Sequence, residues 1–506
     1  MRKTLNNVLF AAGGVFFAQM LGSLRSFVLA RLIEPSDYGI WTAVQVIVTL
    51  SPIACLGTVE ALLKQVPYFR GKADSTGLRE IEESVFASLA IAALLTAGCF
   101  LVFGGALPFK FIRQNLLLSQ ITAASAAIGF FRAFYYHRCA AYEDFKSVSA
   151  IDMVQSIAGF AFVLGLAWKW GLPGGVTGYF VGECLTWVCA GYICSRTHGS
   201  VRPHFQVRLM NRAVAVGFPI TVIWWVYALH TTVGRMTSIS FLGNTQTGYY
   251  GAASSMAMLF SLVPNTIGRV FYPRVNAQIG GKAGLQGIRQ SVVVPTTAIA
   301  LLLPMVQVVI FYLLPVVYYD FLPKYRDGLL CAQILILGAF FVGLIRNGAN
   351  YLIAVDMQMR LMKYVVVSLI ANAAGCLFVV RAGFGINGIA VVASGASALL
   401  ASLIWNRVFT ELEYERRSQL SIFGRFYLSF LGCLAAIAFV SFCFSSFTVY
   451  SRALLPVKMA LALLIFGILL VSFSSTRHQL KTLYRRGWSH VSERLRRGPE
   501  KELSRL

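Results

Sequence analysis

The chain has 506 residues, of which 57% are hydrophobic and only 13% charged, and its formal net charge is +24. A soluble globular domain carries about 25% charged residues, so this composition excludes a large soluble enzyme and indicates an integral membrane protein. The excess of basic residues therefore has to be compared with membrane topology before nucleic acid is considered as a partner.

Long apolar stretches recur from one end of the chain to the other. A helix that crosses a bilayer core needs about 20 mostly apolar residues. Fourteen stretches meet this requirement, which predicts an all-α integral membrane protein without a soluble domain. The predicted spans cover residues 7–31, 40–63, 84–106, 116–137, 150–168, 175–195, 213–235, 248–268, 291–315, 328–346, 361–380, 387–405, 425–446 and 455–474.

The Lys and Arg residues are unevenly distributed between the two sides of this arrangement. If the N-terminus lies in the cytoplasm and the chain alternates, roughly three quarters of the 44 Lys and Arg residues fall in inside segments or at inner helix ends. This bias predicts that both termini are cytoplasmic. It also accounts for the net charge through contact with anionic lipid, without a nucleic-acid partner.

Three sequence features recur about 210 residues further along the chain, and they predict an internal repeat. The turn "IEPSDYGIW" at 33–41 recurs as "LGNTQTGYY" at 242–250, and "GGVTGYF" at 174–180 recurs as "GINGIAV" at 385–391. Because six spans fit within one offset, the two copies have the same orientation. The matched residues are Arg25 with Arg235, Gly39 with Gly248 and Gly178 with Gly388.

This repeat divides the chain into two parallel six-helix halves, residues 1–212 and 213–424, followed by two extra transmembrane helices in 425–475. Parallel repeats are a transporter architecture, with the binding site between the halves. Short outside turns are predicted at residues 35–39 and 243–248 from their Pro, Gly, Asn and Asp content. Prolines inside the spans, Pro52 and Pro219 among them, predict breaks or static kinks.

The segment 476–506 is basic and carries apolar residues at helical spacing. It predicts an amphipathic helix on the inner membrane surface, and a disordered basic tail is the alternative. The ten cysteines contain no Cys-x-x-Cys pair. Cys184, Cys189 and Cys194 are five residues apart, which places them on different faces of a helix. They are interpreted as packing residues, and no metal site is predicted.

Charged side chains within predicted spans are costly in a bilayer and usually face the protein interior or a hydrated cavity. Arg25 lies deep in the first span and Arg235 lies in its repeat mate. The alternative for Arg25 and Glu183 is a structural ion pair. The residues predicted to bind an anionic substrate are Arg25, Lys64, Arg132, Arg235 and Arg269, and those predicted to couple an ion are Glu183, Asp152, His230 and Glu60.

Several of these residues have a second interpretation. Lys64, Arg269 and Arg346 lie at inner helix ends, where a long cationic side chain can snorkel to the interface. His230 either titrates in a proton-coupled step or is a structural histidine. Basic residues outnumber acids in the intramembrane set, which favours a phosphate or diphosphate ligand that arginine binds bidentately.

The sequence contains no enzyme signature. There is no phosphate-binding P-loop, no zinc motif and no nucleophile elbow, so neither enzymatic activity nor a cofactor is predicted.

The stretch "SFVLARLIEPSDYGIW", its second copy ending in "TGYY" and the later "GINGIA" resemble the polysaccharide flippases of the multidrug/oligosaccharidyl-lipid/polysaccharide (MOP) exporter superfamily. The resemblance covers essentially the whole chain. It implies a bacterial inner-membrane protein that moves an undecaprenyl-diphosphate-linked oligosaccharide from the inner to the outer leaflet by alternating access. It also implies cationic residues in a central cavity and possible contacts with polysaccharide polymerase or assembly proteins.

Two other functions fit the same pattern less well. A cation-coupled multidrug exporter of the same fold would need a lobe rich in acidic residues, which the sequence does not show. A membrane polysaccharide polymerase or glycosyltransferase would need a sizeable outside loop, whereas the predicted outside loops are at most about a dozen residues long.

Overall fold

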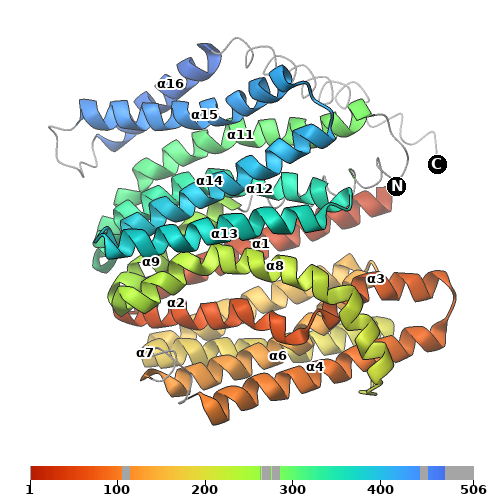
Figure 1. Cartoon of the computed structure of the whole chain (residues 1–506). Coiled ribbons are helices and arrows are strands. Elements are labelled where there is room, and N and C mark those ends of the chain that lie inside the picture. Colours follow the sequence, from red (N-terminus) through yellow and green to blue (C-terminus); the bar gives the residue numbers. More distant parts are fainter. Residues whose placement is uncertain are drawn as a thin grey trace, which may run out of the picture. The chain divides into compact units, whose positions relative to one another are not determined.

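The computed structural model describes residues 2–104, 114–261, 264, 275, 285–444 and 454–472. Within these residues the chain is helical and contains no β-strand, as predicted. Ten of the described helices are long and apolar enough to cross a membrane. The fold is therefore that of an all-α integral membrane protein (Figure 1).

Each of the predicted spans contains a described helix. The predicted basic tail at 476–506 lies outside the described residues. The helices are α1 (Arg2–Leu32), α2 (Pro35–Leu50), α3 (Thr58–Gly71), α4 (Ser75–Phe103), α6 (Leu116–Ala141), α7 (Phe145–His198), α8 (Val207–Phe241), α9 (Gly243–Met258), α11 (Leu285–Val316), α12 (Leu329–Ala354), α13 (Gln358–Arg381), α14 (Gly385–Glu411), α15 (Arg416–Cys443) and α16 (Leu455–Ser472).

The turn between α1 and α2 is shorter than its sequence predicts. Glu34 is extended and Pro35 is already the first residue of α2, because its fixed φ suits the start of a helix. The residues after Pro35 therefore form the first turn of α2 and not a loop. In the same way, Gly243 is the first residue of α9.

The predicted second span is broken in the middle. Residues Ser51–Cys55 form a 3₁₀ helix with Pro52 in its first turn, and Leu56 and Gly57 then have φ values of 48° and 78°. α3 starts after this left-handed pair. A side chain at Gly57 would also collide with the backbone at Gly217 of α8, so this break is a point of close contact between two helices.

α7 comprises two predicted spans. It consists of two helical arms joined by a sharp kink at Gly171, where the chain reverses direction. This glycine has φ 60° and ψ −141°, a conformation that L-residues avoid. The two arms pack closely, since a side chain at Gly178 would collide with the carbonyl of Phe162. The ends of the hairpin also meet, and His198 lies 3.3 Å from the carboxylate of Asp144.

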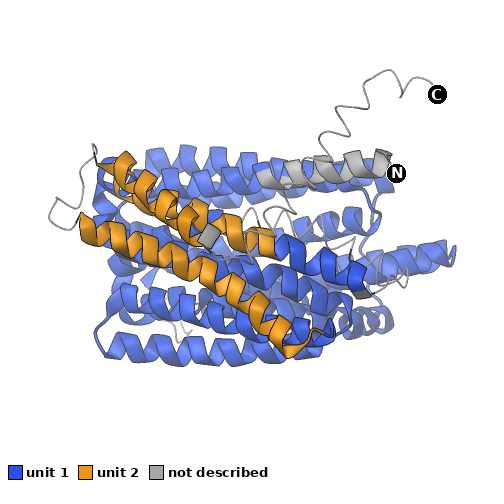
Figure 2. Ribbon diagram, turned by 90° about the horizontal axis from the view of Figure 1, so that it is seen from above, with its two compact units in different colours: residues 1–296, 317–413 blue, residues 297–316, 414–506 orange. Residues whose placement is uncertain are grey.

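The chain contains two compact units, residues 1–296 with 317–413 and residues 297–316 with 414–506 (Figure 2). In the first unit α4, α6 and α7 lie side by side, as do α12, α13 and α14 (Figure 1). α2 packs between these groups against α8 and α9. In the second unit α15 packs against α16, and Ser429 donates to the carbonyl of Ala300 at 2.6 Å.

The two copies of the predicted repeat meet in a reciprocal contact. A Cβ atom at Gly39 would collide with the carbonyl of Asn244, and one at Gly248 would collide with the carbonyl of Pro35. Gly39 and Pro35 are offset from Gly248 and Asn244 by the same number of residues. The missing side chain of each glycine therefore allows the backbone of the other copy to approach closely. We call this end of the first unit the Pro35 end.

Candidate functional site

The first unit contains a cavity of about 620 Å³. Its lining comes from α1 and α2 on one side and from α8, α9, α12, α13 and α14 on the other. These two sets of helices belong to different halves of the predicted repeat. The cavity therefore lies where the parallel-repeat architecture places a transporter's binding site.

The charge of the lining is entirely positive. Among the described residues that line the cavity there are three arginines, Arg25, Arg235 and Arg346, and no aspartate or glutamate. The uncharged polar lining includes Gln45, Tyr250 and several serine and threonine hydroxyl groups. This combination of fixed positive charge and neutral hydrogen-bonding groups suits an anionic, polyhydroxylated ligand.

Arg25 and Arg235 reach the cavity from opposite halves. The Arg25 guanidinium lies against α7, where its Nη1 is 2.6 Å from the position of a Cβ atom at Gly159. Arg235 donates from Nε and Nη2 to the Ser254 hydroxyl at 3.2 and 3.1 Å. Both arginines also interact electrostatically with Tyr38, so the two charges converge on one region of the cavity.

Aromatic side chains pack together at the Pro35 end, next to the cavity. Tyr38 is 1% exposed, and its ring packs edge-on against Tyr325, with 5.9 Å between centroids. Tyr249 packs against the same ring at 6.1 Å. The Tyr325 hydroxyl donates to the carbonyl of Ile33 at 3.2 Å, and Lys324 forms an ion pair with Glu34. We call this set of contacts the seal.

His230 lies in the cavity wall as a structurally bonded side chain. The Ser368 hydroxyl donates its one proton to the carbonyl of Ala396 at 2.8 Å, so it accepts from His230 Nε2, also at 2.8 Å. Asn372 donates to the carbonyl of His230 at 2.9 Å. This arrangement favours the structural interpretation of His230, although Nδ1 has no hydrogen-bond partner among the described residues.

Arg132 and Glu183 form a buried ion pair in the other half. Arg132 Nε lies 3.0 Å from Glu183 Oε2, and the Glu183 side chain is 3% exposed. Gln155 donates to the second carboxylate oxygen at 3.0 Å. Tyr179 interacts electrostatically with Glu183, Arg132 and Arg25, which connects the pair to the cavity arginine.

The remaining predicted site residues lie elsewhere. Lys64 is exposed on α3, and Glu60 is partly exposed one helical turn before it. Asp152 is partly exposed on the first arm of α7 and interacts electrostatically with Arg132. None of the three lines the cavity. Arg269 lies outside the described residues.

Arg346 is the cavity cation that the sequence did not assign to the site. Its position at the inner end of a predicted span favoured snorkelling. In the structure its guanidinium lies 5.7 Å from the centre of the Trp224 ring and contributes to the lining. The signal that would have found it is the series of aromatic residues at 224–227, which offers a face for a cation.

Solved structures with this fold are membrane transporters. A lipid II flippase MurJ in an inward closed conformation is 14% identical, with a TM-score of 0.72 over 94% of this chain and 100% of that one. An inward-facing multidrug resistance MATE transporter is 12% identical, with a TM-score of 0.65 over 78% of this chain and 95% of that one. A MOP superfamily transporter from Pyrococcus furiosus, described by a binding pocket of reverse polarity, is 11% identical, with a TM-score of 0.56 over 81% and 96%.

The chain thus has the fold of the MOP superfamily transporters. A family model described as "Polysaccharide biosynthesis protein" matches residues 4–277, more than half of the chain. The protein belongs to this polysaccharide biosynthesis family, which confirms the resemblance found in the sequence. A search of curated proteins finds no match.

Proposed function

We propose that the protein is a flippase that moves an undecaprenyl-diphosphate-linked oligosaccharide from the inner to the outer leaflet of the bacterial inner membrane. The observation that carries this proposal is the charge of the cavity, whose described lining has three arginines and no carboxylate. Membership of the polysaccharide biosynthesis family supports a glycan substrate.

The cavity suits the polar head of such a lipid and not its tail. A volume of about 620 Å³ is within the range of small-molecule sites, about 300–1,000 Å³. It holds a diphosphate with its first sugars, while a long polyprenyl chain stays in the surrounding lipid. Arg25 and Arg235 bind the diphosphate from the two halves. The hydroxyl and amide groups of the lining replace water around the sugars.

Alternating access follows from the position of the seal. The Pro35 end contains the predicted outside turns, and its contacts join predicted outside segments only to one another. At the opposite end, the contacts likewise join predicted inside segments to one another. Arg138 of α6 pairs with Glu82, and Arg289 of α11 donates to the carbonyl at the end of α14. The structure thus supports a state closed toward the predicted outside. Rocking of the two halves about the cavity opens this seal.

We further propose that Glu183 couples this movement to an ion gradient. Protonation of the carboxylate would remove the charge that holds Arg132. The change would reach Arg25 through Tyr179, which interacts with all three groups. Glu60 and Asp152 remain candidates for the path of the proton or sodium ion.

A second candidate function is export of organic cations, because the fold is shared with multidrug resistance MATE transporters. Cations require carboxylates or open aromatic faces for binding. The three arginines would repel such a substrate by like charge. The lining therefore argues against this alternative.

A binding experiment distinguishes the two candidates. The purified full-length chain is titrated with a short-chain polyprenyl diphosphate, with the matching monophosphate and with a lipophilic organic cation. We expect the diphosphate to bind at least tenfold more tightly than the monophosphate, and Arg25→Ala to remove this preference. Arg31→Ala is the matched control, because Arg31 is an exposed residue of the same helix that does not line the cavity. Preferential binding of the organic cation would overturn the proposal.

A further inference from the structure

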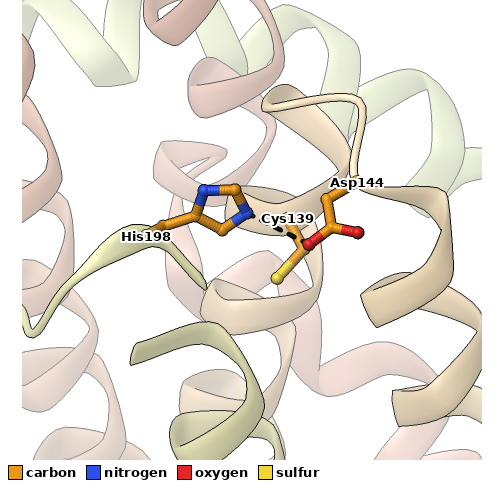
Figure 3. A group of neighbouring side chains, drawn as sticks. All are labelled: Cys139, Asp144 and His198. Carbon is orange, nitrogen blue, oxygen red and sulfur yellow. Dashed lines mark hydrogen bonds and ion pairs between the residues drawn. The ribbon is translucent and has the colours of Figure 1, made fainter. Parts of the chain in front are cut away.

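Three potential metal ligands converge at the helix ends opposite the Pro35 end. Cys139 lies near the end of α6, Asp144 precedes α7 and His198 is the last residue of α7. One ligand atom from each side chain lies within 4.8 Å of the other two. Figure 3 shows the thiol, the carboxylate and the imidazole pointing toward one another.

A fourth donor lies next to this cluster. Cys194 precedes His198 by four residues, so both side chains share one face of the helix. The Cys194 side chain belongs to the same buried cluster as Cys139, and its sulfur lies outside the group of three ligand atoms that are within 4.8 Å of one another. Both cysteines are fully buried, in contact with Val148, Ile151 and Ala190. The residues present are thus two thiols, one carboxylate and one imidazole, the usual ligand types of zinc.

The surrounding contacts hold these side chains in place and leave some of their electron-pair donor sites unused. Asp144 caps α7, accepting from Ser147 N at 3.2 Å and from the Ser147 hydroxyl at 2.6 Å. A carboxylate has about four acceptor sites, so this role leaves room for a metal bond. The His198 ring stacks on Tyr142 at 4.2 Å, and its Nε2 faces Asp144 at 3.3 Å.

Arg138 stabilises the backbone next to this cluster. Its guanidinium pairs with Glu82 at 2.8 Å and donates to the carbonyls of His198 and Gly199, both at 2.8 Å. These bonds fix the end of α7 that carries the imidazole. Arg138 also lies 3.6 Å from the Cys194 sulfur, where its charge offsets that of a thiolate.

We propose that Cys139, Asp144 and His198 form a binding site for a thiophilic divalent cation of the zinc type, with the neighbouring Cys194 thiol as the fourth ligand after a shift of its side chain. The site differs from the substrate cavity in its residues and its ligand chemistry, and it is independent of the proposed flippase activity. This site could not be predicted from the sequence, because its donors come in two pairs separated by the full length of the α7 hairpin.

A metal ion at this position would join three helix ends. It would connect the end of α6 to both ends of the hairpin, whose second arm carries Glu183. Structural sites of this kind contribute their binding free energy to folding. The expected consequence is a more stable hairpin when the ion is bound.

The test uses the purified full-length protein after treatment with a chelator. Zn²⁺ alone is titrated against a chromophoric competitor, and Co²⁺ alone is used to record the absorption of a tetrahedral thiolate site. We expect one ion per chain, bound with a rise in thermal stability. Cys139→Ser and His198→Asn should each weaken Zn²⁺ binding by on the order of 100-fold or more.

Two further variants keep the test decisive. Asp144→Asn retains a good helix cap but removes the anionic ligand, so a loss of binding without a loss of apo stability supports the site. Cys184→Ser, on the same helix and outside the cluster, should bind Zn²⁺ like the unaltered protein. Equal Zn²⁺ affinity in the Cys139→Ser, His198→Asn and unaltered proteins, or no binding to any of them, would overturn the proposal.

Discussion

Individual arginines in this protein have very different roles, and their partners decide which. Arg132 has a carboxylate partner at 3.0 Å, so its charge is neutralised locally. Arg138 has Glu82 at 2.8 Å and two carbonyls. Arg235, in contrast, is held by a neutral serine hydroxyl, which orients the guanidinium but leaves its positive charge available to a ligand. At the scale of residues, Arg235 therefore differs from Arg132 and Arg138, because its hydrogen-bond partner Ser254 carries no charge.

Replacing Arg25 should impair substrate binding more than folding. A hydrogen bond to a charged group contributes about 1.5–3 kcal/mol, so Arg25→Ala should weaken binding of a polyprenyl diphosphate by roughly 10- to 100-fold. Arg25→Lys should retain part of the affinity, because it keeps the charge and loses the bidentate geometry. Titration of the purified variants measures both effects. Unchanged affinity in Arg25→Ala would remove this residue from the site.

The Arg132–Glu183 pair should behave as a buried pair whose partners depend on each other. Glu183→Ala leaves a guanidinium of 22% exposure without its carboxylate and should cost about 3 kcal/mol of stability. The double variant Arg132→Met with Glu183→Leu removes both charges and should recover much of that loss. Thermal unfolding in detergent compares the variants. If the double variant unfolds at the temperature expected from adding the single effects, the two residues are not coupled.

At the scale of helices, glycines set the closest approaches. Gly57 permits the left-handed break between α2 and α3, and Gly171 permits the reversal of α7. Gly39 and Gly248 lack side chains where the two copies of the repeat touch. Each of these positions is a joint or a contact. We therefore expect substitutions there to change the movement of helices more than the local helix content.

The Pro35 end offers the sharpest test of this idea. Gly39→Val and Gly248→Val each place methyl groups on a backbone carbonyl of the other copy, and overpacking of this kind costs about 1–3 kcal/mol. Both variants should hold the seal apart and reduce glycan export in cells. Gly395→Ala is the control, because no atom of the described residues lies within 4 Å of its added Cβ atom. Normal export with valine at both contact positions would show that the seal does not have to close.

The sequence predicted the helices far better than the partners of their side chains. Apolar length alone located the spans, and the recurrence of Gly39 as Gly248 identified two turns that meet in space. The sequence offered an ion pair as the alternative role of Glu183 but could not identify Arg132 as its partner, because the packing of α6 against α7 decides which charges meet. Arg346 was missed for the same reason: depth along a span does not tell which way a side chain faces.

The metal cluster illustrates a further limit. Spacing rules find ligands that are neighbours in sequence, whereas Cys139 and His198 become neighbours only after α7 folds back at Gly171. The kink at this one glycine brings the ligands together, so the cluster could not be predicted from the spacing of its residues.

At the scale of the whole molecule, the contacts between turns support the predicted alternation of the chain. Glu34 pairs with Lys324, although 290 residues separate them, and both lie in predicted outside segments. In a variant without native cysteines, Glu34→Cys and Lys324→Cys should react with a membrane-impermeant maleimide in intact cells. Arg202→Cys should react only after the membrane is opened. The reverse pattern would invert the topology and with it the direction of transport.

The measurement that tests the central claim most directly is the leaflet location of lipid-linked oligosaccharide in cells that lack this protein. Units on the outer leaflet are distinguished from those inside by their reaction with an impermeant reagent that modifies sugars. The account predicts that intact units accumulate on the cytoplasmic leaflet, that the unaltered gene restores outer-leaflet units, and that the gene carrying Arg25→Ala does not. Units that still reach the outer leaflet in the absence of the protein, while surface polysaccharide is lost, would contradict a flippase and indicate a later step such as polymerisation.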